Sequence, residues 1–202
     1  MNLSLKNKKV LVTGSSYGIG LEIAKCLSKE GCVVAINGRN KRKLFKASKL
    51  VSGSFPIQGD VTNYEIAKRV INNTVKNLGG IDILICNVGS GKSKKIGKES
   101  YDEWNKVFRK NFWSVVNIVK ESQKVLIKSK GNIVCISSIC GLEVISDAPA
   151  TYSTAKSALN TYIKCMSHFF GKYQVRINGI APGNIFFKNS IWEKKLKKQP
   201  SK

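Results

Sequence analysis

Residues 10–27 read VLVTGSSYGIGLEIAKCL, and this stretch decides the fold. A short apolar run leads into a turn with three glycines, and a helical pattern follows. Gly14 permits a tight exit from the strand, Gly18 lets the backbone approach a pyrophosphate, and Gly20 allows the helix to pack against the sheet. Because a helix N-terminus favours negative charge, the stretch predicts a strand, a phosphate-binding turn and a helix.

The same alternation of short apolar runs and helical patterns continues along the chain. The expected strands are Lys9–Thr13, Cys32–Asn37, Ser54–Gln58, Ile81–Cys86, Gly131–Ser137 and Val175–Ile180. The expected helices are Gly18–Glu30, Arg42–Val51, Asn63–Leu78, Tyr101–Ser129 and Tyr152–Gly171. This alternation predicts a Rossmann-like α/β fold, in which a doubly wound parallel sheet lies between two helical layers. At 202 residues, we expect one domain spanning residues 1–202.

Composition narrows the classes of protein. The net charge of +23 raises nucleic-acid binding as an alternative. Only five of the 35 basic residues are arginines, however, and the lysines are scattered, so we expect solvated surface and no specific nucleic-acid partner. The sequence has no secretory or membrane-spanning pattern, which predicts a soluble, cytoplasmic protein. Six cysteines without a C-x-x-C pair, and a single histidine, predict no metal site.

The end of the second strand bears on the choice of dinucleotide. Ligands of doubly wound sheets bind beyond the carboxyl ends of the strands, and an acidic residue there favours the free 2′-hydroxyl of NAD. Here the sequence is AINGRNKRK, in which Gly38 leaves space and Arg39 can pair with a 2′-phosphate, assisted by Asn40 and Arg42. The stretch therefore predicts NADP(H) in preference to NAD(H), and the alternative is a solvated basic turn.

Two Tyr-x-x-x-Lys pairs occur, and each places its side chains on one helix face. With so many lysines, such a pair is expected about once by chance. Tyr152 and Lys156 follow Ser138, a hydroxyl at the end of an expected strand, whereas Tyr64 and Lys68 have no such partner upstream. A neighbouring ammonium, together with a nicotinamide cation, favours the phenolate, so we expect these charges to lower the pKa of Tyr152 and we expect a catalytic role for this pair.

Residues 85–93, ICNVGSGKS, end like a nucleotide-binding P-loop. That motif requires a glycine five positions before Gly91, where this chain has Cys86. The loop instead follows the fourth strand, so we expect Asn87 and Gly89 to border the dinucleotide.

In order and spacing, these motifs resemble the single-domain short-chain dehydrogenase/reductase family. The matching stretches are T-G-x-x-x-G-I-G at Thr13–Gly20, Asp60-Val61, C-N-V-G at 86–89 in place of N-N-A-G, Asn111, Ser138, Tyr152-x-x-x-Lys156 and VRINGIAPG at 175–183. Together they cover nearly the whole chain. The resemblance implies an NAD(P)(H)-dependent oxidoreductase that interconverts an alcohol and a carbonyl on a small-molecule substrate.

The resemblance also implies roles for individual residues. Tyr152 is the implied general acid/base, Lys156 its pKa partner and ribose ligand, and Ser138 the group that orients the substrate oxygen. Asn111 is implied to hold a water that links Lys156 to solvent. The implied cofactor-binding residues are Gly14, Ser16, Gly18, Ile19, Gly20, Arg39, Asp60, Val61, Asn87, Gly89, Tyr152, Lys156, Pro182 and Gly183.

Two departures from the family pattern leave alternatives open. The threonine that commonly follows Pro182-Gly183 is replaced by NIFFKN, and the sequence stops at Lys202, before the family's last helix and strand. We therefore expect a truncated sheet with Val175–Ile180 as an exposed edge, and a weakened homo-oligomer. A cofactor-binding protein without turnover is the alternative function. Lys92, Lys94 and Lys95 beside the expected substrate mouth suggest a sugar-related or other anionic substrate, and the alternative is ordinary exposed charge on a loop.

Overall fold

The computed structural model describes residues 3–186 and residue 193. The strands are β1 (Lys9–Val12), β2 (Val33–Gly38), β3 (Phe55–Gln58), β4 (Ile83–Cys86), β5 (Asn132–Ile136) and β6 (Arg176–Ile180). The helices are α1 (Gly18–Lys29), α2 (Lys41–Ser48), α3 (Tyr64–Leu78), α4 (Tyr101–Phe108), α5 (Ser114–Ser129) and α6 (Ala150–Gly171), with a π-helical turn at Arg109–Trp113 and a 3-10 helix at Ile139–Gly141.

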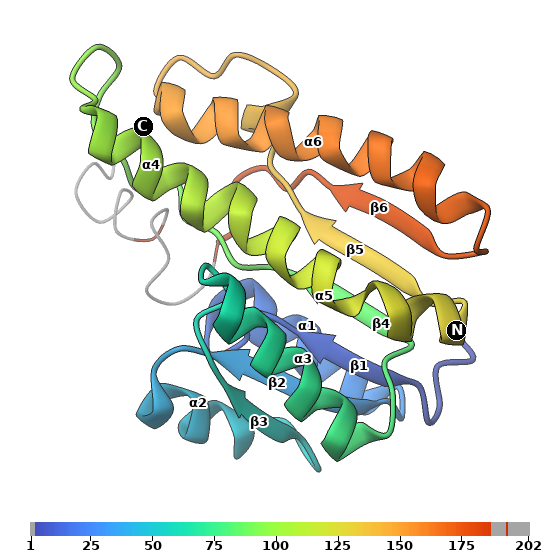
Figure 1. Cartoon of the computed structure of the whole chain (residues 1–202). Helices are drawn as coiled ribbons and strands as arrows, with labels where there is room; N and C mark the ends of the chain where they lie inside the picture. Colours follow the sequence, from blue (N-terminus) through green and yellow to red (C-terminus); the bar gives the residue numbers. More distant parts are fainter. Residues whose placement is uncertain (1–2, 187–192, 194–202) are drawn as a thin grey trace.

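Within the described residues the strands form one parallel sheet in the order β3-β2-β1-β4-β5-β6 (Figure 1). The order reverses between β1 and β4, which are neighbours in the sheet although two strands separate them in the chain. This reversal is the topological switch point of a doubly wound sheet, and the loops after β1 and β4 diverge there to leave room for a ligand. The expected fold class is confirmed.

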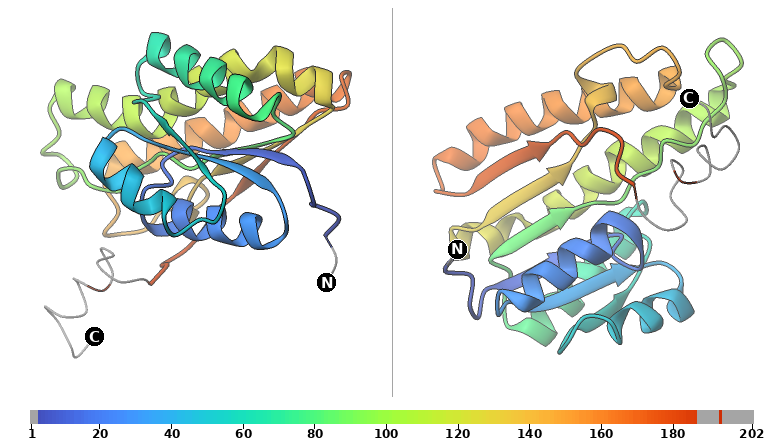
Figure 2. Two further views of the ribbon diagram at one scale, coloured as in Figure 1. Left: turned by 90° about the horizontal axis from the view of Figure 1, so that it is seen from below. Right: turned by 180° about the vertical axis from the view of Figure 1, so that it is seen from behind.

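Helices cover both faces of the sheet (Figure 2). One buried cluster joins side chains from α3, α5 and α6 to the sheet, with Leu11, Ile118 and Phe170 fully buried. The second cluster joins α1 and α2 to the opposite face through residues such as Val10 and Val34. Burying both faces makes the strands almost continuously apolar, which is why the short β-branched runs were readable in the sequence.

The long helix expected at Tyr101–Ser129 is interrupted. It is divided into α4, the π-helical turn and α5. Inside the turn, Asn111 is fully buried and its amide nitrogen donates to the carbonyl of Val107 at 3.0 Å and to that of Ser90 at 3.1 Å. A side chain that hydrogen-bonds to backbone carbonyls competes with regular helix geometry, and π-turns are frequent at functional sites.

Strand β6 is the last strand of the sheet in the described part of the chain. In this strand only Ile177 is buried, and the other four residues are exposed. Its position at the end of the strand order agrees with the expectation of an edge strand. Over the described ranges, the helices are too short or too polar to cross a bilayer.

Candidate functional site

The glycine-rich turn after β1 has the geometry expected for a phosphate-binding loop. Gly14 and Gly18 both have φ of +63°, a left-handed conformation that strains other residues. A Cβ on Gly20 would lie 2.3 Å from the side-chain nitrogen of Asn87, which itself donates to the carbonyl of Gly14 at 3.0 Å. The predicted turn therefore depends on Asn87, which binds it to the loop after β4.

Helix α1 begins at this turn with its N-terminal groups available. Its N-cap residue, Tyr17, makes no side-chain capping bond and its first turn carries no acidic residue. By contrast, the side chains of Asn40, Asn63 and Ser100 cap α2, α3 and α4. Uncapped N–H groups and the helix dipole favour an anion, so the turn and the start of α1, with the partly exposed Ile19, fit a pyrophosphate.

The end of β2 lies beside the turn. A Cβ on Gly38 would lie 3.2 Å from that of Ser16, so the strand end needs a small residue. The next residue, Arg39, keeps 69% of its side chain exposed, and its Nη1 lies 3.8 Å from Asp60 Oδ2 after β3. Asn40 caps α2, because its carbonyl oxygen accepts from the backbone of Lys43 at 2.9 Å, and its assistance to Arg39 stays a prediction.

The end of β3 supplies Asp60 and Val61, two of the implied cofactor-binding residues. Asp60 accepts from the backbone N–H of Thr62 at 3.1 Å, which fixes its carboxylate. Val61 is buried, and its carbonyl accepts from the side chain of Asn117 in α5 at 3.2 Å. Asn117 is a supporting residue that the sequence analysis missed, because it belongs to no local motif.

The loop after β4 is held from two sides. Asn87 donates its backbone N–H to the hydroxyl oxygen of Thr13 at 3.0 Å, and Ser90 donates its N–H to Asn111 Oδ1 at 2.9 Å. Between them, a Cβ on Gly89 would lie 2.9 Å from Asn111 Oδ1 and 3.4 Å from Lys156 Nζ. Gly89 is thus a point of close approach where the loop, the π-helical turn and α6 meet, and the role of Asn111 in holding a water stays a prediction.

Helix α6 brings the expected catalytic group together at the end of β5. Lys156 is 3% exposed, its Nζ donates to the carbonyl of Ile136 at 2.7 Å, and it lies 5.9 Å from the centroid of the Tyr152 ring. Ser138 is buried and accepts from the backbone of Cys140 at 3.2 Å. Tyr152 forms a side-chain hydrogen bond with Ser138. Tyrosine, lysine and serine therefore occupy one site.

Burial shifts the pKa of both titrating groups. It lowers the pKa of Lys156 to about 8, because a buried ammonium loses its hydration. It also raises the pKa of Tyr152, and the hydrogen bond with Ser138 only partly opposes this effect. Desolvation of the phenolate is the largest cause of this rise for Tyr152. The lowering expected from the sequence includes the charge of a nicotinamide cation and stays a prediction.

Two features that support this group were missed by sequence reasoning. A Cβ on Gly141 would lie 2.7 Å from the backbone of Lys156, so the segment after Ser138 packs directly on α6. Asn160 reinforces the contact by donating to the Gly141 carbonyl at 3.0 Å, while its oxygen meets the hydroxyl of Ser137 at 2.6 Å. The glycine three positions after Ser138 was the feature of the sequence that could have indicated this close packing.

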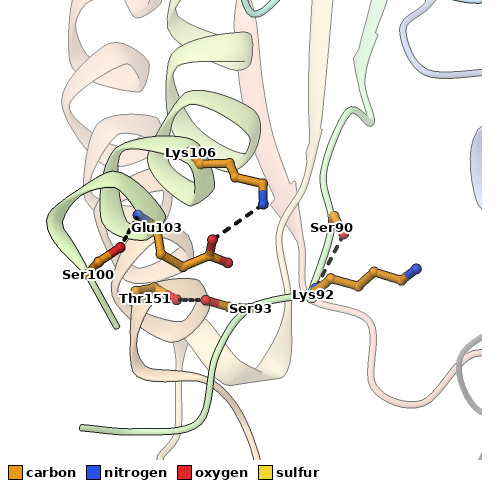
Figure 3. Close-up of polar contacts among 7 residues, drawn as sticks. All are labelled: Ser90, Lys92, Ser93, Ser100, Glu103, Lys106 and Thr151. Carbon is orange, nitrogen blue, oxygen red and sulfur yellow. Dashed lines mark hydrogen bonds and ion pairs between the residues drawn. The ribbon is translucent and has the colours of Figure 1, made fainter. Parts of the chain in front are cut away.

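The loop after Gly89 is attached to the start of α6. The hydroxyls of Ser93 and Thr151 lie 2.7 Å apart, and Thr151 directly precedes Tyr152 (Figure 3). A Cβ on Gly91 would lie 3.8 Å from the Tyr152 ring. Figure 3 shows the Lys92 side chain extending away from the Ser93–Thr151 contact. The loop therefore borders the tyrosine, as expected for one side of a substrate mouth.

The segment after β6 closes another side of the site. Ile139 donates its N–H to the carbonyl of Pro182 at 3.2 Å, and Ser137 donates to the carbonyl of Ile180 at 2.7 Å. A Cβ on Gly183 would lie 3.8 Å from the Ile139 side chain. Pro182 and Gly183 thus lie alongside the residues that flank Ser138. Part of the stretch NIFFKN, from residue 187 onward, lies outside the described residues.

The second tyrosine–lysine pair is elsewhere and differs in character. Tyr64 is the first residue of α3 and is 43% exposed, and Lys68 is exposed on the same helix. A hydrogen bond with Glu121 raises the pKa of Tyr64 by stabilising the phenol. Tyr64 and Lys68 are therefore a pair of surface residues.

The comparisons with known proteins agree with this geometry. The family described as short chain dehydrogenase matches residues 8–197. An oxidoreductase of Staphylococcus aureus strain MW2, named as uncharacterized, is 33% identical over 90% of this chain and 79% of its own length. The 3-oxoacyl-[acyl-carrier-protein] reductase FabG of Chlamydia muridarum is 33% identical over 92% of this chain and 77% of its own.

A solved structure extends the agreement to three dimensions. The short-chain dehydrogenase/reductase of unknown function from Caenorhabditis elegans, solved with cofactor, superposes with a TM-score of 0.88 at 28% identity. The alignment covers 98% of this chain and 80% of that one. The fold, the site and these matches together show that this chain belongs to the short-chain dehydrogenase family of NAD(P)-binding oxidoreductases.

Proposed function

We propose that this chain is an NADP(H)-dependent oxidoreductase that interconverts an alcohol and a carbonyl, with Tyr152 as its general acid/base. The observation that carries the proposal is the buried Lys156, fixed 5.9 Å from the Tyr152 ring at the strand end that carries Ser138. A buried lysine whose ammonium is bound to a backbone carbonyl is costly to maintain, and such groups concentrate at functional sites.

The chain's own groups account for the proton transfer. A bound nicotinamide supplies the hydride, and the protein orients the substrate and handles the proton. The hydroxyl of Ser138 donates to the substrate oxygen, and the phenol of Tyr152 transfers its proton to the same atom. Because burial raises the pKa of Tyr152, this residue is protonated at neutral pH, which suits carbonyl reduction.

Lys156 serves both steps of the cycle. Its pKa of about 8 leaves it mostly protonated at pH 7, so it stabilises the phenolate that remains after proton transfer. It also lies beside Gly89, where it would serve as the ribose ligand of a bound cofactor. For alcohol oxidation, the positive charge of an oxidised nicotinamide would lower the pKa of Tyr152 and so favour the phenolate.

The preference for NADP(H) is supported by the end of β2. Gly38 packs against Ser16, where a larger side chain would be crowded, and Arg39 follows with most of its side chain exposed. A guanidinium at this position pairs with a 2′-phosphate, whereas NAD-binding sites use a carboxylate on the 2′-hydroxyl.

The substrate proposed is a small carbonyl or alcohol with negative charge, such as a sugar-related acid. Lys92, Lys94 and Lys95 are exposed on the loop that Ser93 attaches beside Tyr152. The Chlamydia relative is named for reduction of a 3-oxoacyl group, which supports a carbonyl as the reacting function. We place this reaction in the cytoplasm, with any homo-oligomer weakened and with no specific nucleic-acid partner.

A second candidate is a cofactor-binding protein without turnover. The exposed face of β6, at Arg176, Asn178 and Ile180, favours it because this strand lies beside the β5 end that holds Ser138. An incompletely covered strand next to the site loosens the geometry on which proton transfer depends.

Fluorescence titration with NADPH, followed by a screen of sugar and acyl carbonyl compounds, separates the candidates. The proposal predicts saturable NADPH binding at moderate salt and NADPH oxidation with at least one carbonyl. Saturable binding without oxidation across the screen supports the second candidate. Failure to bind either NADPH or NADH contradicts both.

A further inference from the structure

A hollow of about 390 Å³ lies next to the proposed 2′-phosphate position. It is lined from the loop after β2 by Arg39, from the end of β3 by Asp60 and Thr62, and from α4 and the π-helical turn by Lys106, Arg109 and Lys110. Cationic side chains thus reach it from two segments some 70 positions apart in the sequence. Such a hollow suits a compact anion more than an apolar ligand.

We infer that Lys110 is a second binding residue for the 2′-phosphate of the adenosine ribose and, with Arg39, determines the preference for NADP(H). The inference rests on the proposed function and names a residue that the motifs do not include. It assigns to Lys110 a part in cofactor recognition and none in proton transfer.

The electrostatics of the hollow support this assignment. The pKa of Lys110 is lowered, first by partial burial and then by the positive charges of Arg39 and Lys106. Asp60 and Glu103 oppose this effect. The Asp60 carboxylate also accepts from Thr62 and lies 3.8 Å from Arg39, whereas Glu103 lies 3.4 Å from Lys106. Asp102 lines the same hollow, so four cations face two carboxylates. A phosphate dianion relieves the repulsion among the cations.

The backbone of Lys110 is held in place. Ser114 donates its hydroxyl to the Lys110 carbonyl at 2.7 Å. The side chain of the adjacent Asn111 accepts from the N–H of Ser90 and donates to the carbonyl of Ser90. Arg39 is likewise fixed at the end of β2, one residue after the close packing of Gly38 on Ser16. Both side chains therefore extend from rigid positions, as phosphate ligands should.

The geometry selects the 2′-phosphate among the phosphates of the cofactor. In this fold, the residue after the second strand faces the 2′ position of the adenosine ribose, and the pyrophosphate lies at the N-terminus of the first helix. Arg39 lines the hollow, whereas the residues of the glycine-rich turn do not line it. Lys110 therefore faces the adenosine end.

Calorimetric titration with four probes tests the inference: NADPH, NADH, adenosine 2′,5′-bisphosphate and adenosine 5′-monophosphate. Lys110→Met should weaken binding of the two 2′-phosphorylated probes about tenfold, the value of one charge-assisted hydrogen bond, and change the other two less than about twofold. Lys110→Arg should restore most of the affinity. Lys120→Met, an exposed lysine on α5, is the matched control and should bind all four probes like the wild type.

The outcomes distinguish this inference from the proposed function. Equal weakening of all four probes, or no weakening of any, overturns the role of Lys110. If Arg39→Met alone abolishes the preference while Lys110→Met leaves it intact, NADP(H) specificity stands and the inference fails. Wild-type protein that binds neither NADPH nor NADH contradicts the proposed function itself, and the inference falls with it.

Discussion

The two tyrosine–lysine pairs of this chain have the same spacing and opposite surroundings. Tyr152 and Lys156 lie at the end of β5, where Lys156 is 3% exposed and donates to the Ile136 carbonyl. Tyr64 begins α3, is 43% exposed and pairs with Glu121, while Lys68 stays in solvent. The comparison teaches that the Tyr-x-x-x-Lys spacing alone does not indicate a catalytic site. The surroundings distinguish the two pairs, because only one has a buried ammonium and a serine hydroxyl at a strand end.

Replacing the phenol should give the largest difference between the pairs. Tyr152→Phe removes the transferred proton, so kcat/KM should fall by a factor between about a hundred and ten thousand, the usual contribution of a general acid. Tyr64→Phe should retain full activity. Steady-state NADPH oxidation measures both variants, with NADPH affinity as the control that each variant still binds cofactor. Equal losses in both variants would remove the distinction.

Replacing the ammonium should give a smaller but still large difference. Lys156→Met removes the charge that stabilises the phenolate and the group beside Gly89, so both kcat and NADPH affinity should fall, with kcat/KM down about a hundredfold. Lys68→Met should change neither. The same assays apply, and circular dichroism should show native folding for both variants. A Lys156→Met enzyme with wild-type kinetics would argue against the site.

The buried lysine should also make stability depend on pH. Since its pKa is about 8 in the folded chain and about 10.4 when unfolded, the folded state loses this proton first, and stability rises with pH between those values. From pH 7 to 9.5, wild type should gain about 2 kcal/mol relative to Lys156→Met. Other titrating groups cancel in this difference. Urea unfolding measures it, and a flat difference would mean that Lys156 is solvated.

Loosening the loop beside Tyr152 should produce the smallest of these effects. Ser93→Ala removes the 2.7 Å contact with Thr151, a hydrogen bond of about 1 kcal/mol, so KM for the carbonyl should rise a few-fold while NADPH affinity stays constant. Ser100→Ala removes a hydrogen bond at the N-cap of α4, at the far end of the same loop, and is the variant with which the KM of Ser93→Ala is compared. If Ser93→Ala instead weakens NADPH binding, the loop contributes to the cofactor site rather than to the substrate mouth.

Much of the fold could be predicted because local and tertiary preferences agree. The strands are short apolar runs buried on both faces, and the turn at Gly14–Gly20 combines strand, glycines and helix in one local pattern. Ser138, Tyr152 and Lys156 were predicted to meet because α6 follows β5 at the carboxyl edge of the sheet. Each of these predictions needed only sequence neighbours and the strand-end rule.

Features set by distant contacts could not be predicted. The π-helical turn depends on Asn111 binding Ser90, twenty-one positions away, and helix periodicity carries no sign of that contact. The rise in the pKa of Tyr152 comes mainly from burial, which could not be judged before the packing was known. The engagement of Asn40 as a helix cap was readable in principle from its place before α2.

Isotope transfer in parallel variants tests the central claim most directly. Wild type and Tyr64→Phe, supplied with NADPH deuterated at nicotinamide C4 and a carbonyl that they reduce, should form alcohol that carries the deuterium. Tyr152→Phe should bind the same cofactor equally well and form labelled alcohol at least about a hundredfold more slowly. Labelled alcohol from Tyr152→Phe at the wild-type rate would contradict the assignment of Tyr152.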